Sequence, residues 1–243
     1  MFSKKKKFMV LDVEGNSAVK PYNVGYVIAD NDGKIYVKRS IALPDCIWEN
    51  LANAIRYGIC ADMHKKNVEE ILSDFNKPKH KRKYLAIGIA QFWEMFSHDV
   101  TKYKVKELFA YNVAFDNSAL YRLFGERFNE LDLQPKDIIS GLLDTRLKSP
   151  RYLDFCCENG YITEKGNFQY KAEYTYQFYT GDTNFVEEHT ALSDVFIELE
   201  LLLWAKRAHK KIDWNVRQAW QELGNYAESI GYIKKVVDKP LEM

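Results

Sequence analysis

The sequence contains no long apolar run, and this absence excludes a membrane-spanning helix. No stretch of the 243 residues reaches the ~18 consecutive apolar residues that such a helix needs. The N-terminus also lacks the uninterrupted apolar segment of a secretory signal, because lysines at positions 4–7 lead into a strand that carries acids. We therefore expect a cytoplasmic protein with no membrane partner.

Cysteine is scarce, and its spacing excludes the usual metal-binding pattern. The chain has only Cys46, Cys60, Cys156 and Cys157, and no two of them form a C-x-x-C pair. A structural zinc site is therefore not expected. The four thiols fit the reduced state that is typical of cytosolic proteins.

Net charge is almost absent, since 35 basic residues oppose 34 acidic ones and leave a formal charge of +1. Any binding of nucleic acid must therefore come from local patches. The strongest patch is the stretch 76–83 (N-K-P-K-H-K-R-K), which is interpreted either as solvated surface or as a phosphate contact. Hydrophobic residues make up 47% of the chain, which is enough to exclude global disorder.

The stretch Phe8–Glu14 (F-M-V-L-D-V-E) is interpreted as a buried strand that carries two acids, Asp12 and Glu14. Side chains two residues apart on a strand point to the same face. Two adjacent carboxylates there repel each other and resist desolvation, and a divalent cation bound to both relieves this conflict. The alternative is that the strand ends at Leu11 and that both acids are solvated.

The remaining pattern predicts an α/β protein. Residues 22–29 and 35–42 are expected to complete an antiparallel meander with the first strand, with a hairpin turn at Asp30–Gly33. Two later strands are expected at 107–111 and 137–143. Helices are expected at residues 67–75, 84–100, 112–124, 147–158, 172–179, 190–208 and 212–233.

Two further acids stand at chemically notable places. Asp116 falls in the first turn of a predicted helix, where free backbone N–H groups favour an anion; plain helix-start chemistry also explains it. Asp194 lies on an apolar face of a long predicted helix, where an unpaired acid is costly. If Thr190 caps that helix, His189 reaches Asp194 only from the approach loop.

These residues, taken in chain order, resemble the DEDDh 3′–5′ exonuclease family, which includes the proofreading subunit of bacterial DNA polymerase, RNase T and oligoribonuclease. D-V-E at 12–14 is similar to the first family motif, N-V-A-F-D at 112–116 to the second (N-x-x-F-D), and H-T-A-L-S-D at 189–194 to the third (H-x-A-x-x-D). The resemblance covers about residues 8–208. It implies an RNase H-like fold with a mixed five-stranded sheet of order 3-2-1-4-5, flanked by helices.

The resemblance also implies a function, namely removal of 5′-mononucleotides from a single-stranded 3′ end, with DNA slightly favoured over RNA. It assigns two Mg²⁺ or Mn²⁺ ions to Asp12, Glu14, Asp116 and Asp194, and the role of general base to His189. The residues expected to bind substrate are Val13, Gly15, Asn112 and Phe115. Phe115 could stack on the terminal base, or it could pack in the core beneath the helix start.

The sequence departs from the family pattern at two positions. Gly15 stands where Thr or Ser is common, and Tyr111 stands where His often precedes the second motif. Gly15 and the aromatic-rich final helix leave open an alternative function, a nucleic-acid-binding module that keeps the fold but has lost turnover.

The domain prediction is an exonuclease domain at 1–210 and a helical extension at 211–243 that packs on or beside it. The final helix is expected to pack on the domain or to contact a partner, either another protein or a second copy of the chain. The abundance of Lys, Asn, Ile and Tyr suggests a low-GC bacterial or phage source.

Overall fold

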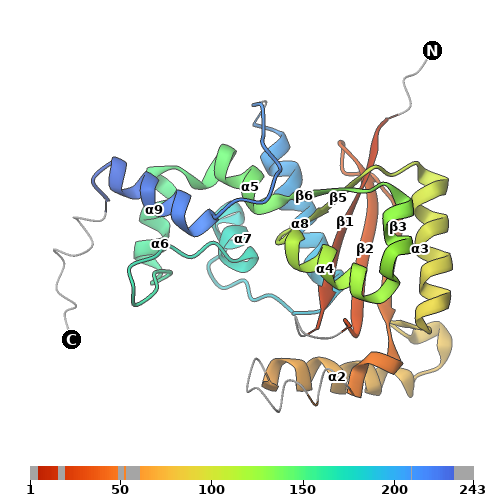
Figure 1. The fold of residues 1–243 in the computed structure, drawn as a ribbon. Coiled ribbons are helices and arrows are strands. Elements are labelled where there is room, and N and C mark those ends of the chain that lie inside the picture. The colour runs from red at the N-terminus through yellow and green to blue at the C-terminus, as the bar shows by residue number, and fades with distance from the viewer. Residues whose placement is uncertain (1–4, 16–19, 49–51, 53–60, 209, 233–243) are drawn as a thin grey trace.

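The computed structural model describes residues 5–15, 20–48, 52, 61–208 and 210–232. A mixed sheet runs through the middle of the molecule, and helices cover both of its faces (Figure 1). No helix in these ranges is both long and apolar enough to cross a bilayer.

Six strands form the sheet within the described residues, in the order β4-β3-β2-β1-β5-β6. Their bounds are β1 Lys7–Glu14, β2 Asn23–Asp30, β3 Ile35–Ala42, β4 Leu85–Ala86, β5 Glu107–Ala110 and β6 Gln134–Asp137. The first three strands form the antiparallel meander that the strand-like runs and the hairpin signal predict. Strand β5 lies parallel to β1, and β6 lies parallel to β5.

The predicted five-stranded sheet of order 3-2-1-4-5 differs from the observed one because a sixth strand joins its edge. This strand, β4, is only two residues long and pairs in parallel with Ile41 and Ala42 of β3. The sequence at 84–88 had been assigned to a helix, since Leu85 fits a helical spacing. The helix begins instead at Ile89.

The strand predicted at 137–143 is also wrong. Strand β6 ends at Asp137, and helix α5 (Ile138–Leu142) follows at once. The Asp137 side chain accepts a hydrogen bond from the backbone N–H of Ser140 and so caps the helix. A short run of buried apolar residues fits a strand or a buried helix equally well, and here the cap decides for the helix.

Strand alternation gives the sheet two buried faces. On β1, Met9 and Leu11 belong to one hydrophobic cluster, and Phe8 and Val10 belong to the other. By the same alternation, Asp12 and Glu14 continue the face of Phe8 and Val10. Both acids therefore point toward the layer of helices that packs on that face.

The helices divide between these two faces. The Met9 face is covered by α2 (Ala61–Phe75), α3 (Ile89–Tyr103) and α4 (Val113–Phe124), with the 3₁₀ segment η2 (Gly125–Leu131). On the Phe8 side, α8 (Ala191–Lys206) packs directly on β1 and β2. The hydrophobic cluster continues from there into α5, the π-helical segment η3 (Leu143–Leu147), α6 (Pro150–Glu158), α7 (Ala172–Thr180) and α9 (Ala219–Ser229), and α6 and α9 lie away from the sheet (Figure 1). A 3₁₀ turn, η1 (Lys79–Lys81), lies between α2 and β4.

Helix boundaries differ from the expected ones mainly at the ends. Helix α6 begins at Pro150. The residue before it, Ser149, caps the helix, because its side chain accepts a hydrogen bond from the backbone N–H of Tyr152. Helix α2 already includes residues 61–66, which precede the expected start at Asn67. Helix α9 ends at Ser229, and the expected segment beyond residue 232 lies outside the described residues.

The segment after residue 210 packs on the Phe8 face of the molecule. The Trp214 and Phe109 rings meet edge to face, with 5.1 Å between their centroids. The Trp214 indole also lies against Gly141, where an added Cβ would be 2.1 Å from the nearest indole carbon. Arg217 pairs with Asp144 at 2.8 Å. The division into a domain at 1–210 and a helical extension at 211–243 stays a prediction.

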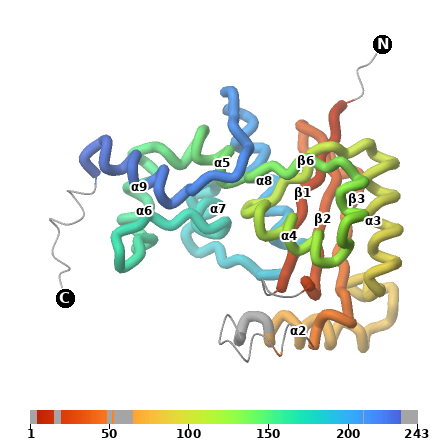
Figure 2. Tube along the Cα trace, viewed as in Figure 1, coloured from red at the N-terminus to blue at the C-terminus, as the bar shows by residue number. Residues whose placement is uncertain are grey.

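The segment between α7 and α8 runs along the end of the sheet where β1 stops (Figure 2). This segment, residues 181–190, carries Glu187 and His189, and it delivers the chain to the first turn of α8. The course of the chain therefore brings the third sequence motif to the end of the strand that carries the first.

Candidate functional site

Strand β1 positions the first two acids at its C-terminal end. Asp12 pairs with Gly25 of β2, and Glu14 pairs with Asn23. Because the pairing is regular up to Glu14, both side chains keep the orientation that alternation gives them. The alternative in which the strand ends at Leu11 is wrong.

The first turn of α8 lies directly on β2 because Gly25 has no side chain. A Cβ built on Gly25 would lie 2.3 Å from the backbone carbonyl carbon of Ala191. The Asn23 side chain also accepts a hydrogen bond from the Ala191 N–H at 3.1 Å. These two contacts fix the start of α8, and with it Asp194, beside the acids of β1.

Asp116 reaches the same place from the other side of β1. It lies in the first turn of α4, directly after β5, and its Oδ1 accepts a hydrogen bond from the Val13 N–H at 3.2 Å. This bond ties α4 to the stretch of β1 that carries the acid pair. Asp116 therefore also makes a tertiary hydrogen bond, besides its position in the first turn of a helix.

Four predicted acids converge on one cavity of about 220 Å³. Asp12, Glu14 and Asp194 each offer a carboxylate oxygen, and these three oxygens lie within 4.8 Å of one another. The residues that line the cavity are Asp12, Val13, Glu14, Tyr111, Asn112, Phe115, Asp116, Ala172, Glu187, Asp194 and Glu198. Among these residues there are six acids and no basic side chain.

Burial and mutual repulsion dominate the electrostatics of the cavity. Desolvation, followed by the charge of Asp116, raises the pKa of Asp12 well above its usual range, and desolvation with the charge of Asp12 does the same for Glu14. Desolvation raises the pKa of Asp116 to about 8. Desolvation and the nearby Asp12 raise the pKa of Asp194 to about 8. The metal-free cluster therefore resists full ionisation.

The cluster fits a hard divalent cation. Asp12 Oδ2 is buried and has no hydrogen-bond partner among the described residues. An inaccessible carboxylate oxygen without a donor is unfavourable, and Mg²⁺ or Mn²⁺ prefers such oxygen ligands. Closely spaced carboxylates of raised pKa are the expected signature of a site built for positive charge.

His189 does not line the cavity. It precedes α8, with a left-handed backbone conformation (φ 54°), and its side chain is 44% exposed. Its Nδ1 lies 3.6 Å from Oε2 of Glu187, and its carbonyl accepts a hydrogen bond from Asn67. The structure therefore brings the four acids together and leaves the imidazole beside Glu187. With Glu173, these two residues form a second group of potential ligand atoms.

The predicted substrate-binding residues also divide. Val13, Asn112 and Phe115 line the cavity. Phe115 is partly buried against the cluster that contains Met9 and also lines the cavity, so packing is observed and stacking on a base stays a prediction. Gly15 lies at the end of β1 but is not among the lining residues.

Four lining residues, Tyr111, Ala172, Glu187 and Glu198, were not predicted from the sequence to belong to the site. Glu187 belongs to the stretch E-E-H before the third motif, and no pattern distinguishes it from Glu188. Glu198 follows Asp194 by four residues, a spacing that places both on one helix face. Tyr111 was noted only as a departure; its hydroxyl donates to the carbonyl of Tyr170 at 2.6 Å.

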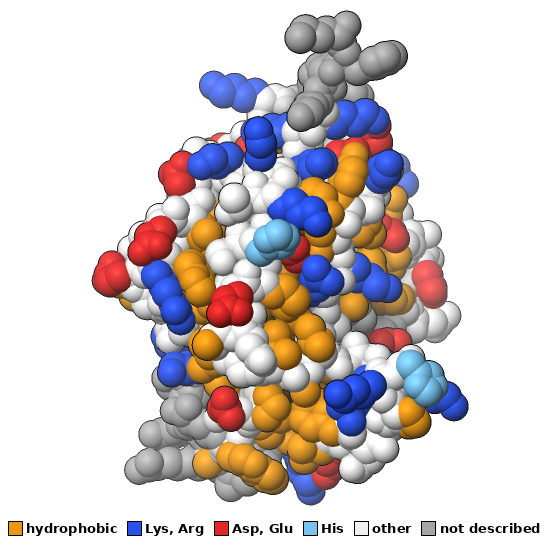
Figure 3. All heavy atoms as spheres, turned by 90° about the vertical axis from the view of Figure 1, so that its right-hand side faces the viewer, with side chains coloured by type: hydrophobic (Ala, Val, Ile, Leu, Met, Phe, Trp, Pro, Cys, Tyr) orange, Lys and Arg blue, Asp and Glu red, His pale blue; other side chains and the backbone are white. Residues whose placement is uncertain are grey.

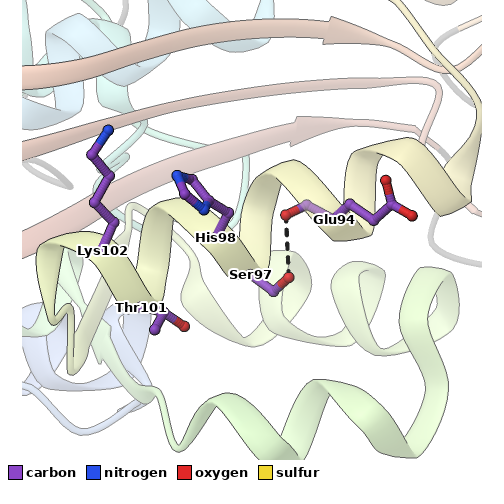
Figure 4. Close-up of a pocket in the computed structure, with 5 residues that line it drawn as sticks. All are labelled: Glu94, Ser97, His98, Thr101 and Lys102. Atoms are coloured by element: carbon purple, nitrogen blue, oxygen red, sulfur yellow. Dashed lines mark hydrogen bonds between the residues drawn. The ribbon is translucent and has the colours of Figure 1, made fainter.

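A second hollow on the surface offers no comparable set of ligands. It runs along α3 and is lined by Glu94, Ser97, His98, Thr101 and Lys102 (Figure 4). All five residues belong to one helix, and the Ser97 hydroxyl donates to backbone carbonyls of the same helix. We therefore place the candidate site at the acidic cavity.

Comparison with known proteins gives structural similarity of low degree. No protein-family model matches the chain, and no curated protein matches it. Among solved structures, E. coli Exonuclease I in complex with a dA16 oligonucleotide is similar, with 16% sequence identity and a TM-score of 0.47. The match covers 93% of this chain and 43% of that one, so this chain spans less than half of its length. A likeness of this degree carries no argument about function.

The contact between Gly25 and Ala191 gives a direct test of how the site is built. We expect Gly25→Ala to lower the free energy of unfolding by about 1–3 kcal/mol, because the new methyl group overlaps the backbone of α8. The shift of α8 should also weaken Mn²⁺ binding, since it moves Asp194. Thermal unfolding and isothermal titration calorimetry measure the two effects.

Gly224→Ala is the matched control, because Gly224 lies in α9 with nothing within 4 Å of the added methyl group. It should be neutral or slightly stabilising. Wild-type stability together with wild-type Mn²⁺ affinity in Gly25→Ala would contradict the proposed role of this contact.

Proposed function

We propose that this protein is a metal-dependent 3′–5′ exonuclease of the DEDDh type with an RNase H-like fold. Its substrate is a single-stranded 3′ end, with DNA favoured over RNA, and its products are 5′-mononucleotides. The observation that carries the proposal is the convergence of Asp12, Glu14, Asp116 and Asp194 on one cavity from three distant segments.

The four carboxylates are the ligands that would hold two Mg²⁺ or Mn²⁺ ions. When bound, such a pair polarises the scissile phosphate and stabilises the attacking and leaving oxygens of an in-line displacement. The contribution of the chain is to hold the carboxylates at fixed positions. Asp116 is held by Val13, and Asp194 by the seating of α8 on Gly25.

His189 is the proposed general base that accepts the proton of the attacking water. Its Nδ1 faces Glu187, an interaction that would orient the ring and leave Nε2 as the atom that accepts the proton. The residue lies on the approach loop, outside the cavity lining, so this role requires the imidazole to turn toward the cavity when the site is loaded.

The mouth of the cavity provides surfaces for the terminal nucleotide. Asn112 is exposed at the start of α4, and Phe115 is half-buried beside it, so an aromatic face and an amide lie next to the acids. We propose that Phe115 stacks on or wedges beside the terminal base and that Val13 and Gly15 approach its sugar and phosphate through backbone atoms.

A basic groove offers a path for the rest of the strand. This groove has a volume of about 440 Å³, and its basic lining residues are Lys38, Arg39, Lys79, Arg82 and Lys83. Arg39 and Lys83 are paired with Asp99 and Glu70. Leu192, two residues before Asp194, also lines the groove, which therefore lies near the start of α8.

The groove concentrates basic side chains, whereas charges of both signs are mixed on one face of the molecule. On the face that carries α3, basic and acidic side chains intermingle, and hydrophobic side chains lie between them (Figure 3). A local concentration of basic side chains would hold phosphates where bulk charge does not. This assigns a phosphate contact to part of the stretch 76–83.

The last segment of the chain is the proposed contact surface for a partner protein or a second copy. Trp220 of α9 is 51% exposed, and Val216 just before the helix is 55% exposed. Tryptophan is among the residues enriched at the cores of protein interfaces.

Digestion of oligonucleotides tests the proposed function. The protein is incubated with Mg²⁺ or Mn²⁺ and 5′-labelled single- and double-stranded DNA and RNA of matched sequence. We expect a ladder of products shortened from the 3′ end, fastest on single-stranded DNA, with substrate binding that weakens as salt rises. The absence of a ladder on every substrate with both metals would refute the proposal.

The exposed position of His189 favours one second candidate, a binding module without turnover. In that case the protein would bind the same oligonucleotides in a metal-dependent manner and leave them intact. A filter-binding measurement beside the digestion separates the two candidates.

A further inference from the structure

Glu198 is a buried acid that the four-carboxylate pattern does not include. It lies on α8, one helical turn after Asp194, and it is 3% exposed. It lines the same cavity as the four predicted ligands. Its position on the helix therefore directs it to the acids rather than to solvent.

One carboxylate oxygen of Glu198 has no donor in its surroundings. Oε2 of Glu198 is buried and has no hydrogen-bond partner within the described part of the chain. The charged residues close enough to influence it are Asp12, Asp116, Asp194 and Glu187, all acidic. A buried carboxylate without a donor or a positive partner is strongly unfavourable.

Asp12 Oδ2 shows the same deficiency in the same cavity. Two unpartnered carboxylate oxygens, one on β1 and one on α8, thus face a cavity whose lining holds no basic side chain. A cation is the partner that satisfies both at once, because it interacts with several carboxylates together.

We propose that Glu198 is a fifth carboxylate of the metal centre, which binds the ions directly or through a coordinated water. This inference rests on the proposed metal-dependent function, since it assigns one more residue to the same site. Four carboxylates balance the charge of two divalent ions, and Glu198 adds one further negative charge. The centre then holds its ions more tightly than a four-acid site.

The test is calorimetric titration of the full chain with Mn²⁺ after removal of metal, without nucleic acid. Glu198→Gln keeps the shape of the side chain and removes its charge. We expect its Mn²⁺ affinity to fall by about 10- to 100-fold, the range found when groups around a metal site are removed. The metal-free variant should unfold at the same or a higher temperature than the wild type, because one like charge has left the cluster.

Glu200→Gln is the matched control. Glu200 lies on the same helix two residues further on, is exposed, and contacts Tyr176 rather than the cavity. The Mn²⁺ affinity of Glu200→Gln should equal that of the wild type. If Glu198→Gln fails to fold, Glu198→Asp keeps the charge but shortens the side chain by one methylene, and we expect it to bind Mn²⁺ more weakly than the wild type.

The outcomes separate the two levels of inference. Wild-type Mn²⁺ affinity in Glu198→Gln or in a folded Glu198→Asp, with loss of binding in Asp12→Asn, would overturn the role of Glu198 and leave the metal centre standing. Wild-type affinity in Asp12→Asn as well would overturn the metal centre itself. Neither result depends on nuclease activity.

Discussion

Replacing Asp12 with Asn is expected to lower the rate of 3′-end hydrolysis by about a thousandfold or more. The variant removes one charged ligand from the centre of the cavity, where ion-mediated stabilisation of the transition state is worth several kcal/mol, and about 4 kcal/mol corresponds to a thousandfold. Folding should persist, because Asn fills the same space and the charge repulsion around residue 12 falls. Initial rates on a 5′-labelled single-stranded oligonucleotide measure the effect.

Asp182→Asn is the control for this variant. Asp182 lies in the exposed turn after α7, and its side chain accepts a hydrogen bond from the Asn184 N–H. It should retain the wild-type rate. If Asp12→Asn retained more than about a tenth of that rate while remaining folded, the assignment of Asp12 as a metal ligand would be wrong.

The metal-free protein is expected to lose stability as pH rises from about 4 to about 8. Burial and neighbouring acids raise the pKa of Asp116, Asp194 and Glu187 to about 8, whereas acids in an unfolded chain titrate near 4. Between these values the folded state holds more protons than the unfolded state, so stability falls as pH rises.

Mg²⁺ or Mn²⁺ should reverse this trend, because ligands bind the ion when deprotonated and the ion binds only the folded state. We expect the unfolding midpoint in EDTA to fall by several degrees between pH 5 and pH 8, on the basis of about 2 kcal/mol and a shift of ~2–4 °C per kcal/mol at this chain length. With excess Mg²⁺ the midpoint at pH 8 should recover.

Thermal unfolding at pH 5, 6, 7 and 8, each with EDTA and with Mg²⁺, provides the measurement. Asp12→Asn serves as the comparison, because one acid fewer should flatten the dependence on pH in EDTA and reduce the recovery with Mg²⁺. Equal midpoints at pH 5 and pH 8 in EDTA, together with no effect of Mg²⁺, would contradict the account of the cluster.

The sequence was sufficient to predict the meander because its signals are local. The apolar run Phe8–Leu11 indicates a buried strand, and the D-N-D-G turn at Asp30–Gly33 joins β2 to β3 as an antiparallel hairpin. The sequence was insufficient at 137–143, where the Asp137 side chain caps a helix by accepting a hydrogen bond from the Ser140 N–H. It was also insufficient at Leu85, because the pairing of this residue with β3 is a tertiary contact. Short apolar runs take the structure that their surroundings impose.

The same distinction holds for the site. Asp12, Glu14, Asp116 and Asp194 could be nominated because each belongs to a short motif on a recognisable element. Glu198 belongs to no motif. Its spacing of four residues from Asp194 places both on one helix face, but it is the contact of Gly25 with Ala191 that turns this face toward the cavity.

The position of His189 depends on a left-handed backbone conformation in the approach loop. Residues other than glycine rarely adopt this conformation, and no spacing rule predicts it. The motif therefore nominates His189 from the sequence, whereas its position beside Glu187 comes from the structure.

Anomalous diffraction from a crystal soaked in Mn²⁺ tests the central claim most directly. The account predicts two Mn²⁺ peaks about 3.5–4 Å apart, each contacted by carboxylate oxygens from the set Asp12, Glu14, Asp116 and Asp194. A cavity without any Mn²⁺ peak, at a concentration that saturates the surface acids, would contradict it.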